Sequence, residues 1–72
     1  MRLTDHAARR IRERGITQAQ LEHAMHHLLG GPAPGSQPGT MVLTGLLPDG
    51  AGSIKIVVQA ADRDTVITVW KV

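Results

Sequence analysis

The chain has 72 residues, a formal net charge of +2 and no cysteine, which excludes disulfide bonds and any cysteine-based zinc site. No apolar run reaches the ~18–20 residues that a membrane-spanning helix needs, and the N-terminus lacks the apolar core of a signal peptide. We therefore expect a single domain over residues 1–72, near the lower size limit for independent folding and compatible with a cytosolic working place.

The first predicted helix covers about residues 4–14. Thr4 is a suitable N-cap, and Gly15 provides the stop. Three apolar residues recur between them at helical spacing, namely Ala7, Ala8 and Ile11. The same segment holds a cluster of basic residues, namely Arg9, Arg10, Arg12 and Arg14. Such a cluster is the charge pattern of a phosphate-binding surface, and it is also the pattern of a plainly solvated helix, which is the more common case.

The second predicted helix covers about residues 17–29 and has a clearer start. Thr17 and Gln20 have the spacing of a capping box. An apolar stripe follows, formed by Leu21, Ala24, Met25, Leu28 and Leu29. The next segment, residues 30–39, is rich in glycine and proline, which excludes a helix or a central strand. We interpret it as a loop that either folds over a ligand or simply connects the two halves of the domain.

Three strand-like runs complete the chain, at about residues 40–47, 53–60 and 65–72. Asp49–Gly50 is a hairpin signal between the first two, and Asp62–Arg63 lies between the second and the third. Two helices followed by hairpin-connected strands are typical of an α+β fold. We expect the two short helices to pack on an antiparallel sheet of three strands, with a fourth strand as an option.

Two-residue turns at these positions would fix a register in which Lys55 lies opposite both Thr44 and Trp70. One face of the sheet is then uniformly apolar and is expected to receive the helices: Met41, Leu43, Ile54, Ile56, Val58, Ile67 and Val69. The other face is mixed and is expected to bind something: Thr40, Val42, Thr44, Lys55, Val57, Gln59, Thr68 and Trp70. A one-residue bulge in either hairpin would exchange these assignments.

His6, Arg10 and Arg14 are spaced four residues apart, so they share one side of the first helix. An imidazole exchanges protons near neutral pH, and a guanidinium binds phosphate through two hydrogen bonds. These groups suit metal-free RNA cleavage, in which a base takes the 2′-hydroxyl proton, cations stabilise the transition state and an acid protonates the leaving 5′-oxygen. A lone histidine near a helix start is nevertheless more often a surface or capping residue.

The segment HAARRIRERGIT, His6–Thr17, resembles the opening motif of the DUF4258 family, small domains found at the ends of bacterial polymorphic toxins. The closing runs IKIVV and VITVW resemble the last two strands of that family. The family is similar to the barnase/EndoU/colicin/RelE (BECR) group of ribonucleases. The resemblance implies a metal-independent endoribonuclease toxin that cleaves RNA, with tRNA as one candidate, through a 2′,3′-cyclic phosphate. It also implies a cognate immunity protein or antitoxin. The place of action would be the cytoplasm of a target bacterium, after delivery as the C-terminal part of a larger secreted protein.

The resemblance places the candidate catalytic residues at His6, Arg10, Arg14, Lys55 and Thr68. Arg9 and Trp70 are candidate substrate-binding residues. The sequence has no Phe or Tyr, so Trp70 is the residue expected to stack a base. We expect no cofactor, no membrane partner and no metal. His23 and His27 have a metal-compatible spacing, but no cysteine or well-placed carboxylate completes the set, so we interpret them as surface histidines. The alternative function is a non-catalytic module of the same fold that binds nucleic acid or protein.

Overall fold

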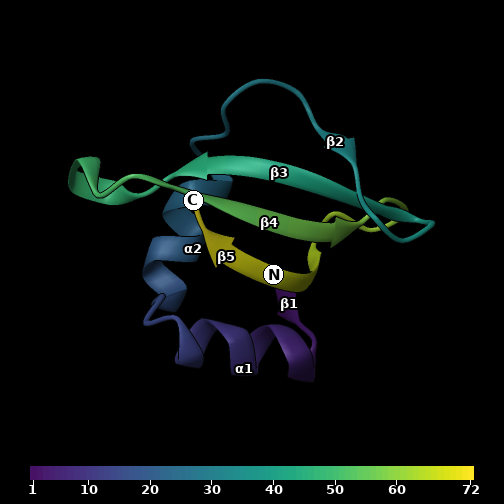
Figure 1. The fold of residues 1–72 in the computed structure, drawn as a ribbon, viewed down its shortest axis with the longest axis horizontal. Helices are drawn as coiled ribbons and strands as arrows, with labels where there is room; N and C mark the ends of the chain where they lie inside the picture. Colours follow the sequence, from purple (N-terminus) through teal and green to yellow (C-terminus); the bar gives the residue numbers. More distant parts are fainter.

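The computed structural model describes residues 1–72, apart from the side chain of Asp49. The elements in chain order are β1 (Arg2–Leu3), α1 (Asp5–Glu13), α2 (Gln18–Met25), β2 (Ala33–Pro34), β3 (Thr40–Leu46), the 3₁₀ turn η1 (Pro48–Gly50), β4 (Ser53–Gln59) and β5 (Thr65–Lys71). Figure 1 shows the strands in one sheet, with α2 behind it and α1 alongside β5. The predicted α+β class and the two N-terminal helices are confirmed. None of the described helices is long and apolar enough to cross a membrane.

Both helix starts are capped as the sequence indicates. The hydroxyl of Thr4 accepts a hydrogen bond from the Ala7 N–H at 3.1 Å. At the second helix, Thr17 and Gln20 form a reciprocal capping box with distances of 2.9 and 3.1 Å. These bonds satisfy N–H groups that have no partner within a helix, so each helix begins at a defined residue.

The sheet has five strands in the order β1-β5-β4-β3-β2. The three long strands are antiparallel, as predicted. Two short edge strands extend them, because β1 runs parallel to β5 and β2 pairs antiparallel with β3. The predicted antiparallel sheet of three or four strands is therefore too small, and the segment 30–39 is not purely a loop. A two-residue strand has no measurable periodicity, so the sequence gives no signal for either addition.

The register of the long strands agrees with the prediction at Lys55, which lies opposite Thr44 and Trp70. The first turn is longer than two residues, since β3 ends at Leu46 and β4 begins at Ser53. The extra residues extend the loop equally on both sides of Asp49–Gly50, so the pairing of the strands is unchanged.

A β-bulge between Val57 and Val58 changes the start of β5. Thr68 still pairs with Val57, but Val58 pairs with Val66, so Ile67 has no direct partner. Val66 is consequently fully buried, whereas Ile67 is half-buried. This corrects the predicted apolar face at one position, because a bulge reverses the sides taken by the residues beyond it.

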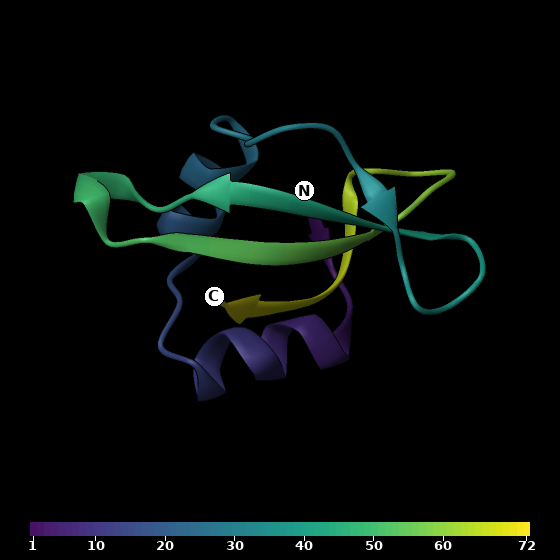
Figure 2. The ribbon, with the colours of Figure 1, turned by 45° about the horizontal axis from the view of Figure 1, so that its top comes forward.

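The hydrophobic core lies between the helices and the apolar face of the sheet. The helices and the corner between them contribute Ala7, Ile11, Ile16, Leu21 and Ala24. The strands and the first turn contribute Leu43, Leu47, Ile54, Ile56, Val58, Val66 and Val69. Met41, also predicted on this face, is half-buried and packs against the core. Figure 2 shows α1 lying beneath β5, so this helix follows the edge of the sheet rather than its centre.

The second helix ends at Met25, four residues before its predicted end. The Nδ1–H groups of His26 and His27 donate to main-chain carbonyl oxygens one turn earlier, at 2.9 and 2.8 Å. The chain then leaves the helix and joins the edge of β3, where Leu28 bridges Gly45 and the Leu29 N–H donates to the Thr44 carbonyl at 2.8 Å. Leu28 and Leu29 are therefore exposed rather than part of the helical apolar stripe.

Candidate functional site

The predicted basic side belongs to α1. Ala7 and Ile11 bury the opposite side of this helix, which leaves His6 and Arg9 exposed to solvent. His6 lies in the first turn, and among the described residues it has no hydrogen-bond or ion-pair partner. The start of α1 is also tied to the sheet, because the hydroxyl of Thr4 donates to the Ile67 carbonyl in β5 at 3.1 Å. This contact holds the first turn, and with it His6, beside β5.

Arg10 forms an ion pair with Glu13, with 2.7 Å between Nη1 and Oε1. Both side chains are more than one-third exposed, so solvent weakens their attraction. Exposed ion pairs of this kind contribute about 0–1 kcal/mol to stability. An incoming anion can therefore replace Glu13 on the Arg10 guanidinium at little cost.

Arg14, the last residue of the basic side, is fixed to the sheet. Its Nη1 donates to the main-chain carbonyl of Val69 in β5 at 3.0 Å. This bond uses one N–H of a guanidinium that has five, so the remaining donors can bind another acceptor. The neighbours of Val69 in β5 are Thr68 and Trp70, which point to the opposite face of the sheet because side chains alternate along a strand.

The other predicted residues share the face of β3, β4 and β5 that the helices leave uncovered. We call it the open face and define it by Val42, Thr44, Lys55, Val57, Thr68 and Trp70. Lys55 donates through Nζ to the Thr44 hydroxyl at 2.7 Å and lies opposite Trp70. Thr68 lies opposite Val57 and is thus a diagonal neighbour of Lys55. Trp70 is 37% exposed.

The structure therefore brings the predicted residues into two groups rather than one. His6, Arg10 and Arg14 lie on α1, whereas Lys55, Thr68 and Trp70 lie on the open face. The two groups adjoin at the β5 edge, where Arg14 meets the Val69 carbonyl. Among the described residues, no hydrogen bond joins His6 to Lys55 or Thr68.

Two residues outside the predicted set help to position the site. Thr44 holds the Lys55 ammonium, and Thr4 ties the start of α1 to β5. The register already placed Thr44 opposite Lys55, so that pairing could have been found from the sequence. The bond from Thr4 to Ile67 spans 63 positions, and no periodicity indicates it.

Three histidines lie in and just after α2: His23 is half-buried, whereas His26 and His27 are exposed. The rings of His23 and His27 stack with their centroids 4.0 Å apart. Among the described side chains, no group of three or more His, Cys, Asp or Glu residues is placed to hold a metal ion.

A carboxylate organises the turn between β4 and β5. Asp62 accepts hydrogen bonds from the Thr65 hydroxyl at 2.8 Å and from the Asp64 N–H at 3.1 Å, and it pairs with Arg2. These interactions hold the pKa of Asp62 below its usual value, with the Thr65 hydroxyl contributing most. The residue thus acts in the turn rather than at the predicted site.

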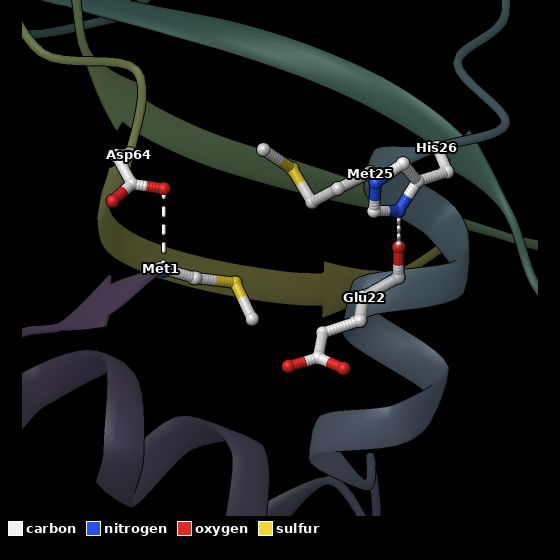
Figure 3. A pocket seen from close by; sticks show the side chains of 5 residues that line it. All are labelled: Met1, Glu22, Met25, His26 and Asp64. Carbon is white, nitrogen blue, oxygen red and sulfur yellow. Dashed lines mark hydrogen bonds and ion pairs between the residues drawn. The ribbon is translucent and has the colours of Figure 1, made fainter.

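A pocket of about 310 Å³ lies on the helix side of the sheet, between α2 and the N-terminal strand (Figure 3). Its lining consists of Met1, Glu22, Met25, His26 and Asp64. None of the predicted catalytic or substrate-binding residues contributes to it. The predicted residues therefore lie on α1 and on the open face and not in this pocket.

Comparison with known proteins gives no further guidance, since no family model matches the chain and no curated protein or solved structure is significantly similar to it.

Proposed function

We propose that this chain is a metal-independent endoribonuclease of the toxin class, which cleaves RNA and leaves a 2′,3′-cyclic phosphate. The observation that carries the proposal is the hydrogen bond of 3.0 Å from Arg14 to the Val69 carbonyl. It holds the basic side of α1 against β5, the strand that also supplies Thr68 and Trp70. The proposed phosphate-binding groups of α1 therefore lie beside the strand that carries the proposed base-stacking ring.

The α1 side supplies the groups that would bind the backbone of the RNA. Arg10 is held only by an exposed ion pair, and Arg14 keeps donors that the Val69 carbonyl does not use. A guanidinium can bind two oxygens of one phosphate at once. The proposed scissile phosphate therefore lies over Arg10 and Arg14, with Arg9 contacting a neighbouring phosphate.

His6 lies one helical turn before Arg10 and is the proposed acid–base group. It takes the proton from the 2′-hydroxyl, whose oxygen then attacks phosphorus while the bond from phosphorus to the 5′-oxygen breaks. The leaving 5′-oxygen takes up a proton, which the imidazolium can return. The arginines stabilise the charge that develops on the phosphate oxygens. On the open face, Lys55 and Thr68 assist, and Trp70 stacks a base of the same strand.

A second function is favoured by a different observation. His6 and the pair Lys55 and Thr68 lie in separate groups, with no hydrogen bond between them among the described residues. A chain that binds RNA through α1 and does not cleave it would need no closer approach. Under the ribonuclease proposal, an acidic immunity protein or antitoxin that covers α1 is the proposed regulatory partner.

The first experiment is RNA cleavage in the presence of EDTA. The purified chain is incubated with total bacterial RNA beside the variants His6→Ala and Arg10→Ala. Arg63→Ala serves as the matched control, because Arg63 is an exposed arginine of the β4–β5 turn outside the proposed site. We expect wild type and Arg63→Ala to give fragments that end in a 2′,3′-cyclic phosphate. His6→Ala should be slower by about 10²-fold or more, the usual effect of losing a general acid or base.

Two outcomes would contradict the proposal. Intact RNA with folded wild-type protein would favour the binding module, provided that Arg10→Ala weakens RNA binding and His6→Ala does not. Cleavage by His6→Ala at the wild-type rate would remove His6 from the mechanism. Each variant is checked for folding by circular dichroism, so that loss of activity is not confused with loss of structure.

A further inference from the structure

We propose that the open face binds a partner protein, through a segment that presents one carboxylate between aliphatic side chains. This goes beyond the proposed ribonuclease, which uses only Lys55, Thr68 and Trp70 of this face. The inference rests on two features of the open face: a group of exposed apolar side chains at one end, and one lysine in their midst.

The apolar group comprises Leu29, Leu46 and Trp70, which are 46%, 42% and 37% exposed. Leu46 lies two residues from Thr44 in β3, so both side chains are on the same face. Gly45 faces the helix side, because a Cβ built on it would point at Ala24 of α2. Leu28 pairs with Gly45 and therefore also takes the helix side. Alternation then places the next residue, Leu29, on the open face. A row of side chains therefore crosses the sheet: Leu29, Thr44, Lys55 and Trp70.

Half-buried side chains continue this apolar surface toward the other end of the sheet, namely Val42 and Val57. Apolar side chains therefore flank Lys55 on this face, and exposed apolar groups gathered on one face mark interaction sites in proteins. Aliphatic residues offer little to RNA, which is bound by cations and aromatic rings. The exposed Leu29 and Leu46 thus favour a protein over RNA as the occupant of their part of the face.

Lys55 specifies the charge of that occupant. Its ammonium has three donors, and the Thr44 hydroxyl takes one of them. The strands β3, β4 and β5 contain no aspartate or glutamate, so this charge has no acidic partner on the face. A carboxylate from a partner would fill the remaining donors, while the aliphatic side chains around it cover Leu29, Leu46 and Trp70.

A second copy of this chain is a poorer occupant. A twofold contact centred on this surface would bring two Lys55 ammonium groups together. Like charges at close range repel, and the repulsion grows as water is excluded from the contact. The charge of the open face therefore favours a different, acidic partner.

The test uses the whole chain and a defined probe, a phage-displayed library of random 12-residue peptides. Selected peptides are synthesised and titrated while the emission of Trp70, the only tryptophan, is recorded. We expect sequences with one Asp or Glu between aliphatic residues, and a blue shift of Trp70 on binding. Lys55→Met and Leu46→Thr should each weaken binding by about tenfold or more, as expected for lost contacts at an interface centre. Changing the acid of the peptide to its amide should have a similar effect.

Lys71→Met is the matched control, because Lys71 lies opposite Ile54 and so belongs to the helix side of β5. Its affinity for the peptides should equal that of the wild type. The proposal is wrong if the library yields no binder, or if the selected peptides bind Lys55→Met and Leu46→Thr as tightly as the wild type. The proposal is also wrong if the chain dimerises and Leu46→Thr abolishes the dimer, because a second copy would then occupy the face.

The result is separable from the ribonuclease test. Leu46 has no part in the proposed cleavage, so Leu46→Thr should lose peptide binding and keep RNA cleavage. Conversely, His6→Ala should lose cleavage and keep peptide binding. The proposed ribonuclease itself brings RNA to Trp70, so a shift of Trp70 emission with RNA does not decide between the occupants. An RNA oligonucleotide whose binding Leu46→Thr weakens about tenfold, or vesicles of phosphatidylglycerol that shift Trp70 emission in place of the peptides, would assign the face to those ligands and overturn the proposal.

Discussion

The two faces of the sheet are made by the same strands and have opposite roles. In β4, Ile54, Ile56 and Val58 are fully buried against the helices, whereas Lys55 and Val57 between them are half-buried on the open face. Burial of the first set supplies the driving force for folding. The second set retains charge and exposed apolar surface. Residues that stabilise the fold and residues available for binding therefore alternate along one strand, and each set can be changed with limited effect on the other.

The largest change in stability is expected when a core residue of β4 is truncated, and its neighbour on the open face provides the comparison. Ile56→Ala leaves a cavity in the centre of the core and should lower the free energy of unfolding by about 2–5 kcal/mol. Val57→Ala removes a half-buried side chain from the open face and should cost about 1 kcal/mol or less. Urea unfolding followed by circular dichroism gives both values. If Ile56→Ala does not fold, Ile56→Val should still cost about 0.5–1.5 kcal/mol. Equal losses at positions 56 and 57 would contradict the contrast between the faces.

A smaller effect is expected where the helix side of the sheet has no room. Gly45 faces α2 so closely that a Cβ there would be 2.7 Å from the Ala24 Cβ and would also meet the Ala24 carbonyl. Gly45→Ala should therefore destabilise the chain by about 1–3 kcal/mol, as overpacked cores generally do.

Gly31→Ala is the matched control for Gly45→Ala, because a Cβ at position 31 meets nothing within 4 Å. Its stability should stay within about 1 kcal/mol of the wild type. Thermal unfolding of both variants makes the comparison. A neutral Gly45→Ala would mean that α2 does not pack as closely on the sheet as the structure shows.

The contrast between the faces was largely predictable, because it depends on alternation. The period of two along β3 and β4 assigns residues to the two faces. The turn centred on residues 49–50 places Lys55 opposite Thr44, and a symmetric extension of that turn leaves the pairing intact. The face of Ile67 was not predictable. Val66 and Ile67 are both β-branched and adjacent, so the sequence suits either one in the core, and only the bulge decides between them.

The site was predictable within each element and not between elements. The spacing of His6, Arg10 and Arg14 is enough to place them on one side of a helix. That Arg14 reaches the Val69 carbonyl depends on how α1 lies along the sheet edge, and a contact across 55 positions leaves no local pattern. Leu28 and Leu29 fit a helical stripe as well as they fit an edge segment. They are exposed because this segment pairs with the edge of β3. Local sequence preferences do not predict such a pairing.

The smallest effect is expected at the turn between β4 and β5, where Asp62 accepts hydrogen bonds from the Asp64 N–H and the Thr65 hydroxyl. The pKa of Asp62 lies below its usual value when the chain is folded, mainly because of the Thr65 hydroxyl. A carboxyl group with a lowered pKa in the folded state stabilises it above the unfolded value of about 3.9, and this contribution is lost as the pH falls through the folded pKa. Asp62→Asn cannot titrate, so its melting temperature should be below that of the wild type at pH 7, and the difference should shrink below about pH 4.

Thr65→Val tests the cause of this pH dependence, because it removes the main donor and keeps the carboxyl group. Its melting temperature should fall less steeply on acidification than that of the wild type. If the melting temperatures of wild type and Asp62→Asn change with pH in parallel, the turn contributes nothing to the acid sensitivity of the fold. The difference should be modest because Asp62 is a turn carboxylate within reach of water, which screens its charges. A large difference would mean that the turn governs more than its own hydrogen bonds, and the register of β5, with Val66 in the core, is the feature it could govern.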